Sequence, residues 1–141
     1  MQVKMTTSEM NSFLEAVFPQ VNGKFVTTEL KPMEAKVHMN VMESDLRPGG
    51  TVSGPAMFSL ADVSFYIVTL AMIGPEALTV TTSCSINFMR KPDPEDMWAK
   101  SRILKLGRSL SVGDVEIFSK GSDKPVAHAN VTYSIPPNSN R

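Results

Sequence analysis

The chain has 141 residues, 42% of them hydrophobic, which fits one domain with a full hydrophobic core. Fourteen basic and fourteen acidic side chains give a formal net charge of zero. This balance excludes an overall electrostatic attraction to nucleic acid or to an anionic membrane. The single cysteine, Cys84, excludes an internal disulfide and a multi-cysteine metal site, and it fits a reducing compartment. We therefore expect one cytoplasmic domain over residues 1–141, with no nucleic acid, membrane or metal partner.

The first half of the chain is predicted to form a short helix, two strands and a long helix. Apolar residues recur at helical spacing up to Phe18, and Pro19 ends that pattern, so residues 1–22 should hold an N-terminal helix. β-branched residues and alternation then indicate two strands. Pro55 suits the first turn of the long helix, which Gly74 ends. The expected bounds are 8–18, 23–30, 35–41 and 55–73, with a loop at 45–54.

The second half is predicted to form four strands joined by turns rich in glycine, proline and polar residues. In the first of these strands, Val80, Cys84 and Ile86 share one face, so Cys84 should point into the core. The expected bounds are 80–88, 97–106, 110–119 and 127–133, followed by a polar tail at 136–141. Because the long helix is apolar nearly all round, it needs cover that a curved antiparallel sheet can supply. We therefore expect an α+β protein with one sheet around a central helix.

Asp62 is an isolated charge in the most apolar part of the chain. Between Thr51 and Pro75 there is no other aspartate or glutamate, and no lysine, arginine or histidine. Burying an ionised carboxylate is costly, so a chain keeps one inside an apolar helix when partners or a function compensate. An aspartate on a partly exposed helix flank is the simpler alternative. We interpret Asp62 as a candidate catalytic residue, with Phe58 on the same helical stripe as a candidate substrate contact.

Three sequence segments carry a resemblance to a known family. They are GGTVSGPAMFSLADVS, TTSCSINFMRKP and GRSLSVGDVEIFSKGSDKPVAHANVTYSIP, and the likeness extends from about Lys24 to Ile135. Together they resemble the hotdog-fold acyl-CoA thioesterases of the phenylacetate-pathway (PaaI-like) type. The resemblance implies a hotdog fold, a small-molecule acyl-CoA thioester as substrate, and no cofactor besides the coenzyme A of the substrate. It also implies a homodimer or a homotetramer built as a dimer of dimers.

The family motif matches this chain at the start of the long helix. Family members have a glycine loop ending in a histidine and two glycines, with an acidic residue eight positions after the first of these glycines. Gly54 and Asp62 match in type and spacing, and Gly50 matches the loop glycine three places before the histidine. The resemblance therefore implies Asp62 as the catalytic carboxylate and Gly54 as the oxyanion donor. It further implies that Thr81 supplies a hydroxyl near the acid.

Three motif positions differ from the family pattern. Ser53 stands where the family has its histidine, and Pro55 stands where it has its second glycine. Arg47 replaces an asparagine that is credited with positioning the thioester or the water. We keep all three, with Gly50, as candidate substrate contacts. The Arg47 guanidinium could pair with the acid of the site, face an anionic group of the substrate, or stay in solvent.

Helix geometry constrains how such a site is built. Gly54 at the helix N-terminus offers free backbone N–H groups to an oxyanion, although it could simply cap the helix. At a rise of about 1.5 Å per residue, Asp62 lies about 12 Å further along, too far for both to touch one thioester carbonyl. Two antiparallel copies related by a two-fold axis would bring them together. The spacing therefore predicts at least a dimer.

An acyl-CoA also carries phosphates, which favour arginine and lysine. The candidate phosphate contacts are Arg90, Lys91, Lys105 and Arg108. Each could equally be a solvated charge at a strand end.

The leading hypothesis is an acyl-CoA thioesterase in which Asp62 acts as general base or nucleophile. A hotdog protein that binds acyl-CoA without hydrolysing it is the alternative, because the asparagine and histidine of the motif are replaced. An enoyl-CoA hydratase ranks last, since the loop lacks a histidine to work with an aspartate.

Overall fold

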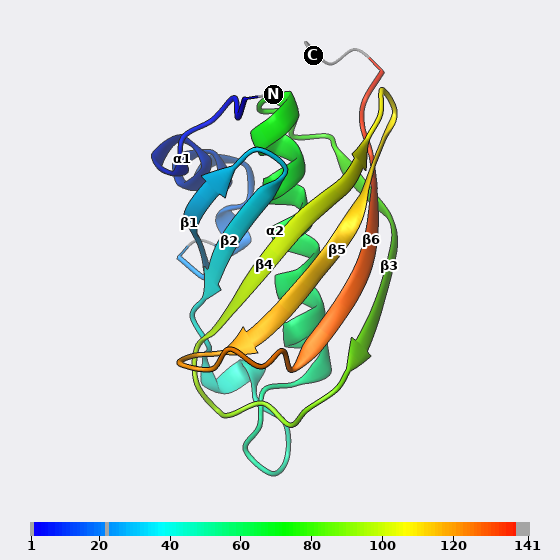
Figure 1. Cartoon of the computed structure of the whole chain (residues 1–141). Helices are drawn as coiled ribbons and strands as arrows, with labels where there is room; N and C mark the ends of the chain where they lie inside the picture. Colours follow the sequence, from blue (N-terminus) through cyan, green and yellow to red (C-terminus); the bar gives the residue numbers. More distant parts are fainter. Residues whose placement is uncertain (1, 22, 138–141) are drawn as a thin grey trace.

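A six-stranded antiparallel sheet curves around one long helix in the computed structural model, which describes residues 2–21 and 23–137 (Figure 1). The strand order is β1-β2-β4-β5-β6-β3, so β1 and β3 form the two edges. The helices are α1 (Thr7–Val17) and α2 (Gly54–Ile73), with short 3-10 turns at Pro19–Val21 and Glu43–Asp45. The strands are β1 (Phe25–Lys31), β2 (Glu34–Met39), β3 (Val80–Phe88), β4 (Met97–Leu106), β5 (Leu110–Ser119) and β6 (Ala127–Ser134).

These elements confirm the expected α+β architecture. The helix and strand bounds agree with the sequence patterns to within a few residues at each end. Of the predicted polar tail at 136–141, residues 138–141 lie outside the described part of the chain.

Helix α2 is the core of the molecule. Leu60, Phe65 and Leu70 are completely buried, and the sheet covers the helix along most of its length (Figure 1). Its N-terminus is capped by Ser53, whose Oγ accepts a hydrogen bond from the Ala56 N–H at 3.2 Å. By length and composition alone α2 could cross a membrane, but 78% of its most apolar stretch is buried inside the protein. Its hydrophobicity is therefore explained by the core.

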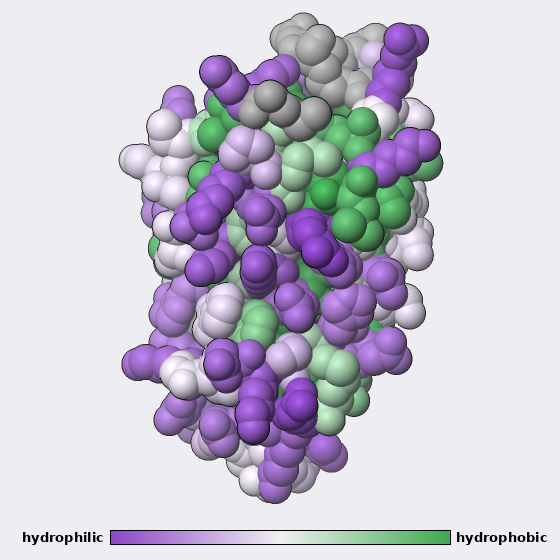
Figure 2. Space-filling model, viewed as in Figure 1, coloured by the Kyte–Doolittle hydropathy of each residue, from purple (hydrophilic) through white to green (hydrophobic). Residues whose placement is uncertain are grey.

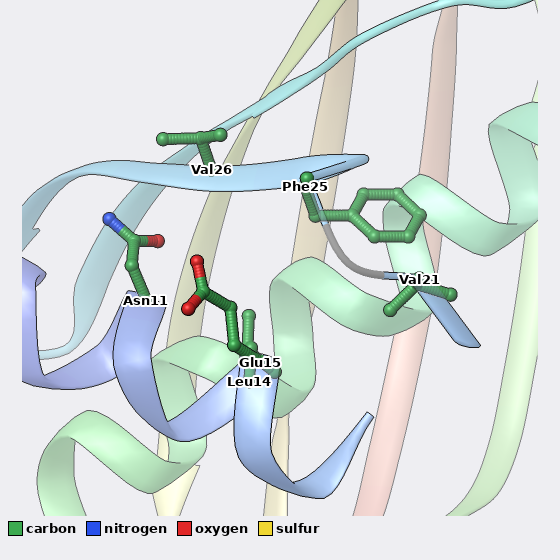
Figure 3. Close-up of a pocket in the computed structure, with 7 residues that line it drawn as sticks. Asn11, Leu14, Glu15, Val21, Phe25 and Val26 are labelled. Atoms are coloured by element: carbon green, nitrogen blue, oxygen red, sulfur yellow. The ribbon is translucent and has the colours of Figure 1, made fainter. Parts of the chain in front are cut away.

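Helix α1 is fastened to the outer edge of the sheet. The amide of Asn11 accepts a hydrogen bond from the Thr27 N–H at 2.8 Å and donates one to the Thr27 carbonyl at 3.1 Å. Thr27 lies on edge strand β1, and no strand formed by residues 2–21 or 23–137 lies beside its outer side. Figure 3 shows Asn11 and Glu15 rising from α1 toward this strand, beside a cavity of about 260 Å³.

We expect Asn11→Ala to lower the free energy of unfolding by about 1–3 kcal/mol, because both Thr27 backbone groups lose their partner in a buried position. Glu15→Ala is the matched control: Glu15 lies on the same helix beside the same cavity, is exposed, and should change stability by less than about 0.5 kcal/mol. Urea denaturation measures both variants. Equal effects of the two substitutions would contradict this role of Asn11.

Strand β3 departs from the strict alternation that its sequence predicts. Its register against β6 shifts between Thr81 and Ser83, which is a β-bulge. The bulge moves Val80 outward, where it is 57% exposed, and turns Thr81 toward α2. The expectation that Val80 shares the core face with Cys84 and Ile86 was therefore wrong, because one extra residue reverses the alternation.

The outward face of the sheet is mostly hydrophilic, with an apolar area in its upper part (Figure 2). Both histidines lie on this outward face of the sheet, and each has a carboxylate partner. His38 Nε2 is 3.1 Å from Asp96, and His128 Nε2 is 3.0 Å from Asp114. Burial opposes ionisation of Asp114, but hydrogen bonds from His128 and Arg102 outweigh it and hold its pKa below the usual range. The His128–Asp114 pair links β6 to β5, and the His38–Asp96 pair links β2 to the residue before β4. Both pairs lie apart from the α2 face.

Candidate active site

The Asp62 carboxylate is held by two hydroxyl groups. Thr81 Oγ1 donates to Oδ1 at 2.6 Å, and Tyr133 Oη donates to the same oxygen at 2.8 Å. Tyr133 also lies 2.9 Å from the main-chain carbonyl oxygen of Asp62. Within the described residues, Oδ2 has no hydrogen-bond partner. The carboxylate is therefore oriented through one oxygen and open at the other.

A cavity of about 140 Å³ lies beside this carboxylate. Its lining residues are mainly apolar or aromatic: Phe18, Asp62, Val63, Tyr66, Ala77, Thr79, Val80, Thr81 and Tyr133. Phe18 packs edge-on against Tyr66, whose hydroxyl donates to the Ala77 carbonyl at 3.1 Å. Burial raises the pKa of Tyr66 to about 12, so this hydroxyl stays protonated and neutral. The surroundings suit a small, largely apolar group next to one carboxylate.

Gly54 occupies a different place on the surface. It is the first residue of α2, and its N–H has no acceptor among the described residues. An apolar groove of about 550 Å³ begins there and is lined by Gly54, Pro55, Phe58, Ser59, Ile86 and Phe88. A free N–H at a helix N-terminus beside an apolar groove can bind an anionic oxygen.

A single chain does not bring Gly54 and Asp62 together. A Cβ on Gly54 would lie 3.3 Å from the Phe88 ring, at one end of β3, whereas Asp62 is bonded to Thr81 near the other end. Seven residues of extended chain separate those ends by about 23 Å. The carboxylate and the free N–H thus belong to two separate surfaces of one chain.

Two of the residues that differ from the family pattern have a structural role at the start of α2. Ser53 caps the helix with its hydroxyl, and Pro55 lies in the first turn, where no N–H is needed. Gly50 has a φ of 79°, a conformation that other residues rarely adopt. The Arg47 backbone closes the loop onto Thr51 at 2.9 Å, while its exposed guanidinium has no partner among the described residues.

The four candidate phosphate-binding cations form two groups. Arg90 and Lys91 follow the Phe88 end of β3, and Arg90 donates to the Pro125 carbonyl at 2.6 Å. Lys105 and Arg108 lie at the β4–β5 hairpin, near the opposite end of β3. Ser134 pairs with both Val80 and Leu110, which puts this hairpin two strands away from the Asp62 end of β3.

Tyr133 and Phe18 line the site but were not identified from the sequence. The alternation of the last strand points Tyr133 inward, which is equally typical of an ordinary core residue. Phe18 was assigned only to the end of the N-terminal helix. Tyr133 lies directly opposite Thr81 in the β3–β6 register. Knowledge of this cross-strand pair would have placed Tyr133 beside the acid, but local sequence patterns do not contain it.

Comparison with known proteins identifies the family. The model of the thioesterase superfamily matches residues 49–126, which is more than half of the chain. The chain belongs to the thioesterase superfamily, and its sheet wrapped around α2 is the hotdog fold. A search of curated proteins found no match.

Solved structures agree with this assignment. A candidate thioesterase from Silicibacter sp. TM1040 is 51% identical, with a TM-score of 0.90, covering 97% of this chain and 96% of that one. A mutant of the phenylacetic acid degradation protein PaaI from Thermus thermophilus is 27% identical, with a TM-score of 0.70 and coverage of 89% and 99%. The protein smu.793 from Streptococcus mutans UA159, solved with acetyl CoA, is 22% identical and shares the fold, with a TM-score of 0.70 and coverage of 79% and 88%.

Proposed function

We propose that this protein is a cytoplasmic acyl-CoA thioesterase that uses Asp62 as its catalytic carboxylate. The observation that carries the proposal is the Asp62 side chain, oriented by two hydroxyl donors and open at Oδ2 beside a cavity, in a chain of the thioesterase superfamily. The reaction needs a carboxylate, water and an oxyanion donor. It needs no cofactor besides the coenzyme A of the substrate.

Two chemical routes are open to this carboxylate. As a general base, Asp62 takes a proton from water, the hydroxide attacks the thioester carbonyl, and the tetrahedral oxyanion is stabilised by an N–H donor. Collapse then expels the CoA thiolate, which recovers the proton. As a nucleophile, Asp62 attacks the carbonyl itself, releases the thiolate and leaves an acyl anhydride that water hydrolyses. Incorporation of ¹⁸O into Asp62 during a single turnover in H₂¹⁸O is expected only for the second route.

The oxyanion donor in this proposal is Gly54 of the partner subunit. Within the described part of the chain, edge strand β3 has no strand beside its outer side, and exposed apolar side chains surround it, an arrangement that favours pairing with a second copy. These side chains are Phe58, Leu78, Val80, Phe88 and Met89. Antiparallel pairing of two β3 strands about Cys84 puts the Phe88 end of one beside the Val80 end of the other. Gly54 of one subunit then approaches Asp62 of the other.

The same pairing groups the candidate phosphate contacts. Arg90 and Lys91 of the partner subunit come to the Asp62 end of β3, and Lys105 and Arg108 of the first chain lie two strands away at the same end of the sheet. We propose that these cations contact the phosphates of coenzyme A. The free guanidinium of Arg47 on the Gly54 loop is then available to an anionic group of the substrate. A dimer, or a dimer of dimers, would contain two such composite sites in each pair.

Gly54→Pro should lower kcat by about 10²–10³-fold, because it removes the N–H that we propose as the oxyanion donor. Proline is well tolerated in the first turn of a helix, and Ser53 before it is already extended, with ψ 156°. Gly54→Ala is the matched control: it adds a Cβ against the exposed Phe88 ring but keeps the N–H. Its kcat should stay within about tenfold of wild type.

Subunit complementation tests whether the site is shared between chains. A heterodimer of an Asp62→Asn chain and a Gly54→Pro chain contains one intact site, with Asp62 from one subunit and Gly54 from the other. We expect it to recover about half of the wild-type activity per dimer, far above either mutant homodimer. A site contained within one chain predicts no recovery, and that result would overturn the shared site.

A non-catalytic acyl-CoA-binding protein is the second candidate, favoured by the replacement of the family asparagine and histidine by Arg47 and Ser53. The deciding experiment is a panel of acyl-CoA thioesters followed by release of free thiol, with binding measured in parallel by calorimetry. We expect turnover on at least one thioester. Binding of the thioesters without thiol release across the panel would overturn the thioesterase proposal in favour of a non-catalytic acyl-CoA-binding function.

A further inference from the structure

Tyr133 reaches the Asp62 side chain from the strand next to Thr81. The two residues are directly opposite each other in the β3–β6 register, and both hydroxyls donate to Asp62 Oδ1, at 2.8 Å and 2.6 Å. Tyr133 is 3% exposed, so its hydroxyl lies inside the protein rather than in solvent. Neighbouring strands thus supply two donors to one carboxylate oxygen.

The Tyr133 hydroxyl has a second acceptor that Thr81 lacks. It lies 2.9 Å from the main-chain carbonyl oxygen of Asp62 as well as 2.8 Å from Oδ1. One phenol group therefore links the carboxylate to the backbone of α2. This contact limits rotation of the Asp62 side chain about its first torsion angle.

The Tyr133 ring is fixed by its neighbours. Its centroid lies 5.9 Å from that of Phe65 and 6.0 Å from that of Tyr66, both on α2. Burial and the charge of Asp62 raise the pKa of Tyr133 far above its usual range, so its hydroxyl keeps its proton. The ring is held in place, and the hydroxyl is a permanent donor.

We propose that Tyr133 is a positioning residue that, together with Thr81, occupies Oδ1 of Asp62 and so assigns the reaction to Oδ2. The inference rests on the thioesterase function proposed above and extends it to a residue outside the family motif. Oδ2 is the oxygen with no partner among the described residues. It is the one that removes a proton from water or attacks the thioester carbonyl.

A purely structural tyrosine is the competing explanation, because a buried hydroxyl has to find a hydrogen-bond partner somewhere. Ser101 is the internal comparison. Its side chain is also buried, but it lies outside the lining of the Asp62 cavity, and its hydroxyl donates to the Ser64 carbonyl at 3.2 Å. Loss of this hydroxyl should therefore leave the carboxylate unaffected.

The experiment compares Tyr133→Phe with Ser101→Ala in the full-length protein, because each substitution removes one buried hydroxyl. For Tyr133→Phe we expect kcat to fall about 10–100-fold with KM changed by less than about threefold, because the substitution disturbs the orientation of the carboxylate and not the binding of the substrate. Ser101→Ala should keep kcat within about threefold of wild type.

The outcomes separate this inference from the proposed function. Loss of activity in Asp62→Asn with an unchanged kcat in Tyr133→Phe would overturn the role of Tyr133 alone. Full activity in Asp62→Asn would instead overturn the proposed catalytic role of the Asp62 carboxylate. A readout without turnover is the ¹³C chemical shift of the Asp62 carboxyl group at neutral pH. This chemical shift should change in Tyr133→Phe and stay the same in Ser101→Ala, and an unchanged value in Tyr133→Phe would overturn the contact as a positioning interaction.

Discussion

Asp62→Asn is expected to lower kcat for acyl-CoA hydrolysis by about 10³-fold or more while the protein stays folded. An amide can neither accept a proton from water nor attack a thioester, so both routes open to the carboxylate are blocked. The two side chains are nearly equal in size, and the asparagine carbonyl oxygen can still accept from Thr81 and Tyr133. Loss of the half-buried charge adds no new strain. Thiol-release kinetics and thermal unfolding of the same sample measure the two effects.

A surface aspartate supplies the control for this substitution. Asp123 is exposed in the turn between β5 and β6, and Asp123→Asn makes the same chemical change away from the cavity. It should leave kcat within about twofold of wild type. Activity of Asp62→Asn close to that of Asp123→Asn would move the catalytic role to another residue.

Gly113→Ala should reduce the free energy of unfolding by more than about 3 kcal/mol, the largest stability effect that we expect from adding one methyl group. A Cβ at Gly113 would lie 2.0 Å from the Arg102 carbonyl oxygen and 2.7 Å from the Phe65 ring. The first of these neighbours is backbone of the paired strand β4, which cannot move without breaking the β4–β5 pairing. The second belongs to the fully buried core of α2.

Gly107→Ala is the matched control for Gly113→Ala. Gly107 lies in the β4–β5 hairpin, where a Cβ would be 3.5 Å from the nearest atom, an ordinary van der Waals distance. We expect a change of less than about 1 kcal/mol in urea denaturation. Similar losses in both variants would mean that glycine flexibility, rather than the space at Gly113, explains the effect.

Much of the fold could be predicted from local sequence patterns. Helix α2 is apolar nearly all round, with a proline in its first turn and a glycine at its end, and these features determine its bounds and its central position. The period-two alternation similarly predicts β4, β5 and β6. The strand order could not be derived in this way, because pairing between distant strands depends on contacts that no local pattern records.

The candidate site was only partly predictable for the same reason. Asp62 stands out by itself, since an isolated charge in an apolar helix needs compensation wherever the helix lies. Thr81 was expected near the acid through the family resemblance, although strict alternation would not have revealed that the bulge in β3 turns its hydroxyl toward Asp62.

Residue types and distances along the chain are enough to predict the central helix, the strand pattern, the isolated carboxylate and the separation between Gly54 and Asp62. The folded chain is needed to place Tyr133 beside Thr81 at Oδ1 of Asp62 and to place Gly54 at the far end of β3. Those facts depend on strand register, on a one-residue bulge and on which strand lies at the edge. Such features arise from contacts between segments far apart in the sequence, as the β3–β6 pair illustrates.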